Sequence, residues 1–337
     1  MATGTSLPLH DRNRIVRWLV TVAALIFVMV VLGGVTRLTE SGLSIVEWRP
    51  VTGTLPPLSD QAWQAEFDKY KTSPEFQKKN SDFSVADFKT IFWFEYLHRL
   101  LGRLIGVVFA VPFFWMLWRR QIPGPLKPRL WLLLGLGALQ GFMGWFMVKS
   151  GLVDRPDVSQ YRLAAHLGLA FAIYGYIVWL VYGLLRPQHG KPAPFVWALT
   201  ALIFLQILAG AFVAGIDAGF IYNTWPAMDN GHIIPPGIWT EPPLWPGMFE
   251  DHRIVQFNHR MLAYLITLLV GVWWWLNRGK GAPAHLLALA TLFQVFAGIV
   301  TVLILPYVPA WLAVFHQAGG LVLFSASLYA LQRVRKA

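Results

Sequence analysis

Long apolar runs alternate with short polar connections along almost all of this 337-residue sequence. A run of about 20 apolar residues is long enough to cross the hydrocarbon core of a membrane as a helix. The pattern predicts eight such helices, at residues 18–36, 91–118, 130–148, 162–185, 193–215, 253–276, 284–304 and 310–332. The segment Leu-Pro-Tyr-Val-Pro at 305–309 separates the last two, because its prolines interrupt an otherwise uncharged run.

The remaining residues form two tails, two long loops and short connections. Residues 1–17 and 333–337 are the tails; the loop 37–90 holds most of the acidic residues, and the loop 216–252 is rich in Pro and Trp. Part of the first loop is predicted to be a short interfacial helix with aromatic side chains on one side: Asp60–Tyr70, with Trp63, Phe67 and Tyr70. The first apolar run is too long for a signal peptide and no small-residue cleavage site follows it, so we expect it to remain as a membrane span.

Basic residues mark one side of the membrane. They cluster in the tails and connections that share a side with the N-terminus: Arg119, Arg120, Lys127, Arg129, Arg186, Lys191, Arg278, Lys280, Arg333, Arg335 and Lys336. Because positively charged loops stay in the cytoplasm, both termini are predicted to be cytoplasmic and both long loops to lie outside.

An internal repeat divides the chain into two similar parts. Gly33-Gly34, Gly42 and Trp48 match Gly210-Ala211, Gly219 and Trp225 at one constant displacement, and Gln140 with Gly144 matches Gln294 with Gly298. Each part contains four spans, an even number, so the two parts share one orientation. We therefore predict an all-α integral membrane protein of two four-helix bundles, residues 18–185 and 193–332, related by a pseudo-twofold axis along the membrane normal.

Composition supports this class. The chain is 56% hydrophobic and only 13% charged, whereas a soluble domain carries roughly a quarter charged residues. The net charge of +11 does not indicate nucleic acid as a partner, because the basic residues lie in connections between apolar runs. The chain has no cysteine, which excludes disulfides, cysteine-bound metal clusters and c-type haem attachment.

Four of the nine histidines lie in spans: His98, His166, His259 and His316. All four spans run from the outer to the cytoplasmic side, and each histidine is expected within about the first two turns, so all four lie at one depth near the outer face. Paired imidazoles on facing helices suit axial ligation of haem iron; another metal or a purely structural role are the alternatives. We interpret His10, His189, His232, His252 and His285 as solvent or interface residues.

Charged residues beside these histidines differ between the two parts. Glu95 precedes His98 by one turn, whereas Gln256 holds the matching place before His259. An acid beside a haem can stabilise positive charge or move protons, and an amide cannot, so the N-terminal part is predicted to be the reaction site and the C-terminal part the electron carrier. The alternative is that Glu95 only pairs with an arginine. Candidate partners for haem propionates are Arg37, Arg99, Arg103 and Arg260.

These motifs identify a resemblance. The eight spans in two repeats, Gly-Gly-Val-Thr-Arg-Leu-Thr-Glu-Ser-Gly-Leu-Ser at 33–44 and Glu-Tyr-Leu-His-Arg at 95–99 resemble heme A synthases over nearly the whole chain. The likeness is to the branch shared by proteobacteria and mitochondria. Some bacterial members have a cysteine pair in the first outer loop, and its absence here removes any thiol-based step.

The resemblance implies a reaction and a set of ligands. Members of this family oxidise the C8 methyl of heme O to the formyl of heme A, by two hydroxylations and loss of water from a geminal diol. His98 and His166 match the ligands of the substrate haem, His259 and His316 match those of a heme B cofactor, and Glu95 matches the acidic residue of the family. With two histidines on the substrate iron, either one ligand leaves or oxidation is outer-sphere.

The resemblance also implies a cellular setting. The reaction implies a heme O synthase (protohaem farnesyltransferase) upstream, cytochrome oxidase assembly factors downstream and an electron donor. Homo-oligomerisation is left open. Membrane lipid surrounds the spans, and a bacterial inner membrane with periplasmic long loops is expected, since no transit peptide is evident.

Two other functions use some of the same features. A quinol-linked di-haem cytochrome b would use the same four histidines for electron transfer and would hold two identical haems, often at two depths. A transporter built from a similar repeat would have broken helices at the bilayer midplane, and no matching mid-span proline interruption is present. The shared depth of the histidines favours the synthase.

Overall fold

Eight long helices dominate the computed structural model, which describes residues 9–49, 52–151, 158–186, 191–239, 244–304, 311–333 and 335–336. All eight are long and apolar enough to span a membrane. They are α1 (Leu9–Leu38), α4 (Val85–Trp118), α5 (Lys127–Gly151), α6 (Gln160–Leu185), α7 (Pro194–Gly215), α9 (His252–Asn277), α10 (Ala282–Ile304) and α11 (Trp311–Arg333). The number and order of predicted spans are confirmed, and the chain is an all-helical integral membrane protein; the predicted break at 305–309 lies outside the described residues.

Shorter elements occupy the connections. They are the helices α2 (Asp60–Lys71), α3 (Pro74–Lys78) and α8 (Leu244–Glu250), the single 3₁₀ turns Thr52–Thr54, Gly124–Leu126, Ala218–Phe220 and Arg278–Lys280, and the two-residue strands β1 (Lys191–Pro192) and β2 (Arg335–Lys336). The strands pair antiparallel and join the connection after α6 to the C-terminal segment. Among these elements, only α2 was predicted from the sequence.

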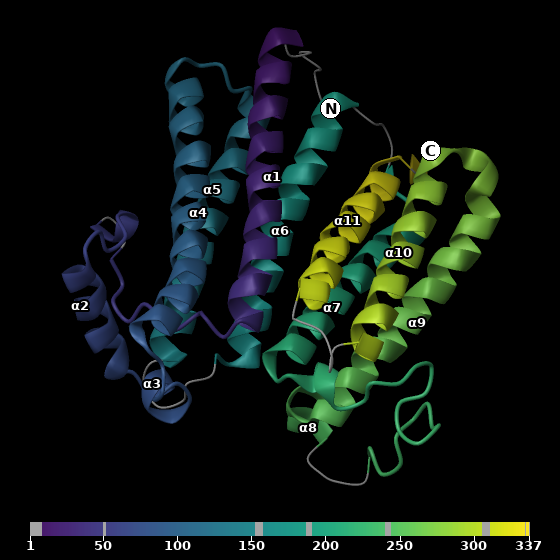
Figure 1. Ribbon diagram of the computed structural model, residues 1–337. Coiled ribbons are helices and arrows are strands. Elements are labelled where there is room, and N and C mark those ends of the chain that lie inside the picture. Colours follow the sequence, from purple (N-terminus) through teal and green to yellow (C-terminus); the bar gives the residue numbers. More distant parts are fainter. Residues whose placement is uncertain are drawn as a thin grey trace.

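The long helices form two groups (Figure 1). The N-terminal group consists of α1, α4, α5 and α6, and the C-terminal group of α7, α9, α10 and α11. One buried apolar core runs through both groups. Polar side chains also join them: Gln317 donates to the carbonyl of Val30 at 2.7 Å, and the hydroxyls of Tyr174 and Ser325 lie 2.8 Å apart. Helices α1 and α6 therefore meet the C-terminal group through α11.

Two long helices begin earlier than the apolar runs indicate. Helix α1 begins at Leu9 rather than residue 18, because no proline or glycine interrupts residues 9–17 and Arg14 is held by a 2.8 Å hydrogen bond to Gln121. Helix α4 begins at Val85 rather than residue 91, because Ser84 and Asp87 form a capping box in which each side chain accepts from the other's backbone N–H.

Helix α2 is confirmed, but its apolar face packs on protein. Trp63, Phe67 and Tyr70 are all buried. They form an aromatic cluster with Phe88 and Phe92 of α4. This face therefore stabilises the N-terminal end of α4 and is covered by protein, since the early start of α4 supplies it with a partner.

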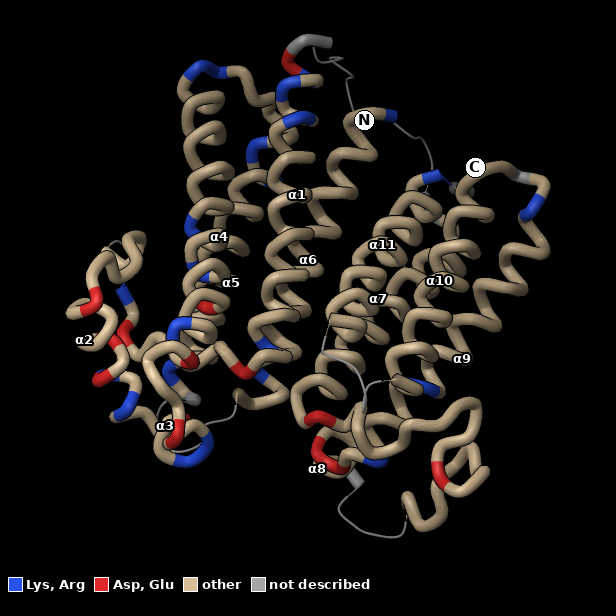
Figure 2. The backbone as a smooth tube through the Cα atoms, in the orientation of Figure 1, with Lys and Arg blue, Asp and Glu red and all other residues tan. Residues whose placement is uncertain are grey.

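Charges are sorted between the two ends of the helices (Figure 2). Asp and Glu gather at the end that carries α2, α3 and α8, whereas Lys and Arg dominate the end near both termini. Large apolar side chains such as Val111, Trp118 and Leu268 are exposed on the long helices between these ends. An apolar girdle of this kind suits contact with lipid.

Candidate functional site

The four span histidines lie on four different helices. His98 is on α4, His166 on α6, His259 on α9 and His316 on α11. The expectation that each lies within two turns of a helix start is wrong for His98, which lies more than three turns into α4 because that helix begins at Val85. All four side chains are half-buried.

The histidines form one pair in each helix group. In the C-terminal group, the rings of His259 and His316 have centroids 6.4 Å apart and planes at 84°. That separation leaves room for one metal atom between the rings at metal–nitrogen distances of about 2 Å. In the N-terminal group, His98 and His166 lie close enough for their imidazoles to interact electrostatically.

A glycine of the preceding long helix lies against each ring. A Cβ added to the glycine would lie 2.9–3.2 Å from the Cε1 atom of the histidine, so a side chain there would displace the ring. The four pairs are Gly33 with His98, Gly144 with His166, Gly210 with His259 and Gly298 with His316. These glycines therefore make space for the imidazoles.

The donor set fits a haem better than a metal ion held by protein alone. The Nδ1 atoms of His98, His166 and His316 are buried and have no partner among the described residues. Within the same residues, no group of three or more His, Cys, Asp or Glu side chains could hold a metal ion. Two imidazoles without further protein ligands suit the axial positions of a haem, whose ring supplies the other four ligands.

Glu95 is a buried carboxylate with three hydrogen-bond donors. It is 2% exposed. One oxygen accepts from the hydroxyl of Ser44 and the backbone N–H of Ile45, both at 2.7 Å, and the other pairs with Arg99 at 2.5 Å. The alternative that Glu95 pairs with an arginine is thus confirmed as a contact. The carboxylate ties Ser44 and Ile45 of the loop 37–90 to α4, one turn before His98.

Gln256 makes the corresponding contacts with opposite polarity. Its amide nitrogen donates to the carbonyls of Gly219 and Tyr222, at 3.3 and 3.0 Å. Tyr222 matches Ile45 in the internal repeat. The N-terminal group therefore has a negative charge where the C-terminal group has a neutral amide.

The arginines that follow two of the histidines bind loop backbone. Arg99 donates to the carbonyls of Ile45 and Glu47, and Arg260 to those of Tyr222 and Thr224, at 2.6–3.2 Å. Both guanidinium groups are largely buried. The contacted carbonyls of Tyr222 and Thr224 match those of Ile45 and Glu47 at the displacement that matches Gly210 with Gly33.

The other two candidate arginines also contact backbone. Arg103 donates to the carbonyl of Arg49 at 2.8 Å, and Arg37 donates to that of Gly215 at 3.3 Å and pairs with Asp217 at 3.4 Å. Arg37 thus links α1 to the loop that follows α7.

Three side chains beside the histidines were missed as functional candidates. Gln140, Gln206 and Gln294 donate to the backbone carbonyls of His166, His259 and His316, at 2.9–3.1 Å. The repeat matched Gln140 with Gln294 and assigned neither a role. A glutamine four residues before each ring-facing glycine was the available signal.

The remaining described histidines are apart from this site. His232, His252 and His285 are exposed, as predicted. His189 lies outside the described residues, and the side chain of His10 is not described.

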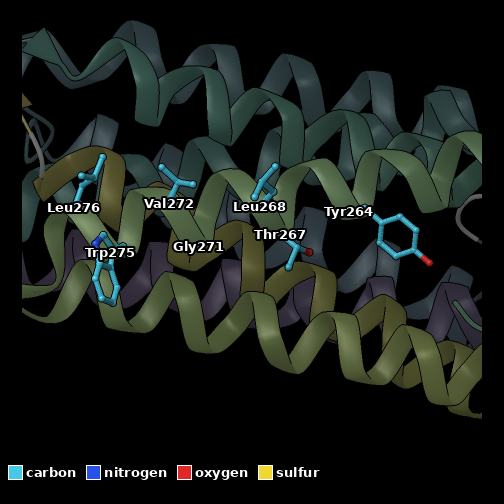
Figure 3. Close-up of a pocket in the computed structure, with 7 residues that line it drawn as sticks. All are labelled: Tyr264, Thr267, Leu268, Gly271, Val272, Trp275 and Leu276. Atoms are coloured by element: carbon cyan, nitrogen blue, oxygen red, sulfur yellow. The ribbon is translucent and has the colours of Figure 1, made fainter.

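An apolar groove of about 600 Å³ lies elsewhere, along α9 (Figure 3). Its lining comes from that helix alone, from Tyr264 to Leu276, and includes none of the four span histidines. Since the groove is open and its lining has no acidic or basic side chain, it belongs to the lipid-facing surface.

Comparison with known proteins gives one consistent result. The family described as COX15-CtaA, cytochrome oxidase assembly protein, matches residues 16–328. A heme A synthase of Parvibaculum lavamentivorans is 50% identical over 332 residues, which cover 97% of this chain and 96% of the relative. Heme A synthases of Nitrosospira multiformis and a Bradyrhizobium species are 49% and 48% identical, with 95% and 97% of this chain and 93% of each relative covered.

Proposed function

Because the chain belongs to the COX15-CtaA family of cytochrome oxidase assembly proteins, we propose that it is a heme A synthase that oxidises the C8 methyl of heme O to a formyl group. The observation that carries this proposal is the site itself: two pairs of span histidines, with a buried carboxylate beside only one pair. A chain with this site and 50% identity to a heme A synthase over 97% of its length has the parts that the reaction needs.

The reaction is a four-electron oxidation of the methyl carbon, which loses two hydrogens and gains one oxygen. Balanced with water as the source of that oxygen, it releases four electrons and four protons in all. The first hydroxylation gives a hydroxymethyl group, the second a geminal diol, and loss of water gives the formyl group. Electrons must leave the site in both steps. A heme B bound by His259 and His316 would supply one-electron transfer, and the neutral Gln256 beside it fits a carrier with no proton chemistry.

The substrate heme O belongs between His98 and His166. The supporting observation is Glu95, whose buried carboxylate accepts hydrogen bonds from the Ser44 hydroxyl, the Ile45 N–H and the Arg99 guanidinium. A buried anion stabilises positive charge that develops nearby. It also holds the Ser44–Glu47 segment against α4, so it orders the loop beside the reacting haem.

The arginines remain proposed propionate partners, with a more specific assignment. Arg99 and Arg260 already hold loop carbonyls, and each has further donor N–H groups in its fork. The Nε atoms of Arg260 and Arg37 are buried without a partner in the described part of the chain. These two atoms are the best placed to receive a propionate or a bridging water.

The two helix groups are proposed to be pseudo-twofold-related bundles, residues 18–185 and 193–332. Several contacts support this relation, because glycine–histidine, arginine–carbonyl and glutamine–carbonyl contacts recur in both groups. With this relation the two haem sites would lie at one depth, which suits electron transfer within the membrane plane.

The orientation is proposed from charge. Both termini lie at the end of the molecule that is rich in Lys and Arg (Figure 2), which is the cytoplasmic signature. The loops 37–90 and 216–252 would then be periplasmic, in a bacterial inner membrane. Partners by chemistry are an enzyme that supplies heme O, assembly steps that accept heme A and a donor or acceptor of electrons.

Haem extraction from protein expressed beside a source of heme O tests the proposal. Wild type should yield heme B together with heme A or hydroxylated heme O, identified by chromatography and mass spectrometry. Glu95→Ala should accumulate heme O, whereas Glu250→Ala, which removes an exposed carboxylate, should behave as wild type. Heme B alone in every sample, at two per chain, would refute the synthase and leave a di-haem cytochrome b.

A further inference from the structure

Three of the four span histidines have a glutamine beside them. It lies one turn before the ring-facing glycine, at Gln140, Gln206 and Gln294. Each amide nitrogen donates to the backbone carbonyl of its histidine. Two of them also contact the ring: Gln140 lies 3.3 Å from Nε2 of His166, and Gln206 lies 3.1 Å from Nδ1 of His259.

The amide oxygens of these glutamines have unused capacity. All three Oε1 atoms are buried, and none has a hydrogen-bond partner within the described ranges. The Nδ1 atoms of His166 and His316 are in the same condition. A histidine bound to a metal through one nitrogen usually donates the other N–H to an acceptor, which fixes the ring and strengthens the ligand. In the structure, the amide nitrogen holds the histidine backbone, and in Gln140 and Gln206 the same nitrogen also faces the ring, so each glutamine fixes its histidine through this donor and keeps a buried acceptor oxygen in reserve.

His98 lacks this partner. The displacement that matches Gly33 with Gly210 matches Met29 with Gln206, so a thioether takes the place of the amide. Met29 is half-buried, and its Cε lies 3.6 Å from the position of a Cβ at Gly102, one turn after His98. A thioether has no N–H and is a weak acceptor. Across the described residues, the buried Nδ1 of His98 has no hydrogen bond.

From this difference we infer that His98 is the exchangeable ligand of the substrate haem and that Gln140, Gln206 and Gln294 are positioning residues for the other three. The inference rests on the proposed function, in which His98 and His166 bind heme O. If His98 leaves the iron, the substrate haem gains a free coordination position. The inference therefore favours ligand loss over outer-sphere oxidation. In the C-terminal pair, both histidines have a glutamine partner, which suits a haem whose two ligands stay bound.

Carbon monoxide is the probe for an exchangeable ligand, because it binds ferrous haem only after an axial histidine leaves. In the reduced holoprotein we expect one of the two haems to bind carbon monoxide. Met29→Gln should slow that binding by about 10- to 100-fold, the usual scale of such partners to metal ligands. Met29→Leu, which adds no polar group, should bind at the wild-type rate.

Matched variants in the other positions extend the test. Gln206→Met should make the second haem reactive toward carbon monoxide, and Gln140→Met should speed binding at the first by freeing His166. Equal rates in wild type and Met29→Gln would overturn the inference, as would carbon monoxide binding at both haems or at neither in wild type. If Met29→Gln does not retain haem, wild type and Gln140→Met still decide, because the inference requires binding at one haem in wild type and faster binding at that haem when His166 loses its glutamine.

Failure of the proposed function would look different. Haems extracted from the same samples report whether heme O or heme A is present. If only heme B is found, the synthase fails, yet the rates still show whether His98 is the exchangeable ligand of whichever haem it holds.

Discussion

The imidazoles of His259 and His316 face each other edge to face across α9 and α11, with ring centroids 6.4 Å apart. The two residues are far apart in the sequence, and each ring lies against a glycine of a neighbouring helix, Gly210 and Gly298. The pair is therefore positioned by the packing of four helices. Its separation accommodates one iron atom, so haem binding depends on both rings together.

Replacing one ligand should empty the C-terminal site. His316→Ala leaves His259 without an opposing ring, and we expect the purified protein to lose most of its heme B while haem in the N-terminal group remains. Quantitative haem extraction per mole of protein measures this. His232→Ala, at an exposed loop position, is the control and should retain both haems. Full heme B content in His316→Ala would show that the assignment of this pair is wrong.

A single methyl group should disturb the same site. In Gly298→Ala the new Cβ would lie 2.9 Å from Cε1 of His316, closer than ordinary van der Waals contact, so the ring must shift. We expect a loss of heme B occupancy of several-fold and a changed spectrum of the low-spin haem. Gly106→Ala is the matched control, because nothing lies within 4 Å of its Cβ position. Identical spectra for both variants would contradict the role of the glycine.

Removing Arg260 should destabilise the loop 216–252. Its guanidinium is 7% exposed and donates to the carbonyls of Tyr222 and Thr224. Arg260→Ala leaves buried carbonyls with fewer donors, which costs about 1–3 kcal/mol. A lower midpoint of thermal unfolding in detergent should report this loss. Lys71→Ala, which removes an exposed pair with Asp68, should leave the midpoint nearly unchanged.

The segment that carries α2 and α3 should lose stability as pH rises. Burial raises the pKa of Glu75 from 4.5 to about 8, despite a 3.1 Å hydrogen bond from Tyr70. Because this pKa is higher in the folded state than in the unfolded state, folding favours the protonated acid. The contribution to stability is complete below pH 4.5 and is lost as pH rises through about 8.

Glu75→Gln removes this titration while it keeps a polar group that can contact Tyr70. We expect the midpoint of thermal unfolding of wild type to fall by several degrees between pH 5.5 and 8.5, and the variant to show a smaller decline. Limited proteolysis of the loop that carries α2 and α3 would localise the change. Parallel declines in both proteins would assign the pH dependence to other groups.

Local sequence features determined much of the architecture. The eight spans follow from apolar runs of membrane-crossing length, because a chain in lipid must satisfy its backbone hydrogen bonds within helices. The repeat and the four span histidines follow from residues that match in the same order in the two parts of the chain. The carboxylate at Glu95 and the amide at Gln256 follow in the same way, since residue identity is itself the signal.

Contacts between distant residues were decided only by the tertiary structure. The apolar pattern predicted that one face of α2 lies at a membrane interface. In the structure, the capping box at Ser84 starts α4 early, and the added turns pack against that face. Arg99 and Arg260 are proposed propionate partners from the sequence, and the tertiary structure adds hydrogen bonds from both to loop carbonyls. Met29 is one of many apolar residues in its span. Its position in the repeat gained meaning only from the hydrogen bonds that folding forms between the glutamines and the carbonyls of the other three histidines, because a hydrogen-bond partner is defined by proximity in space.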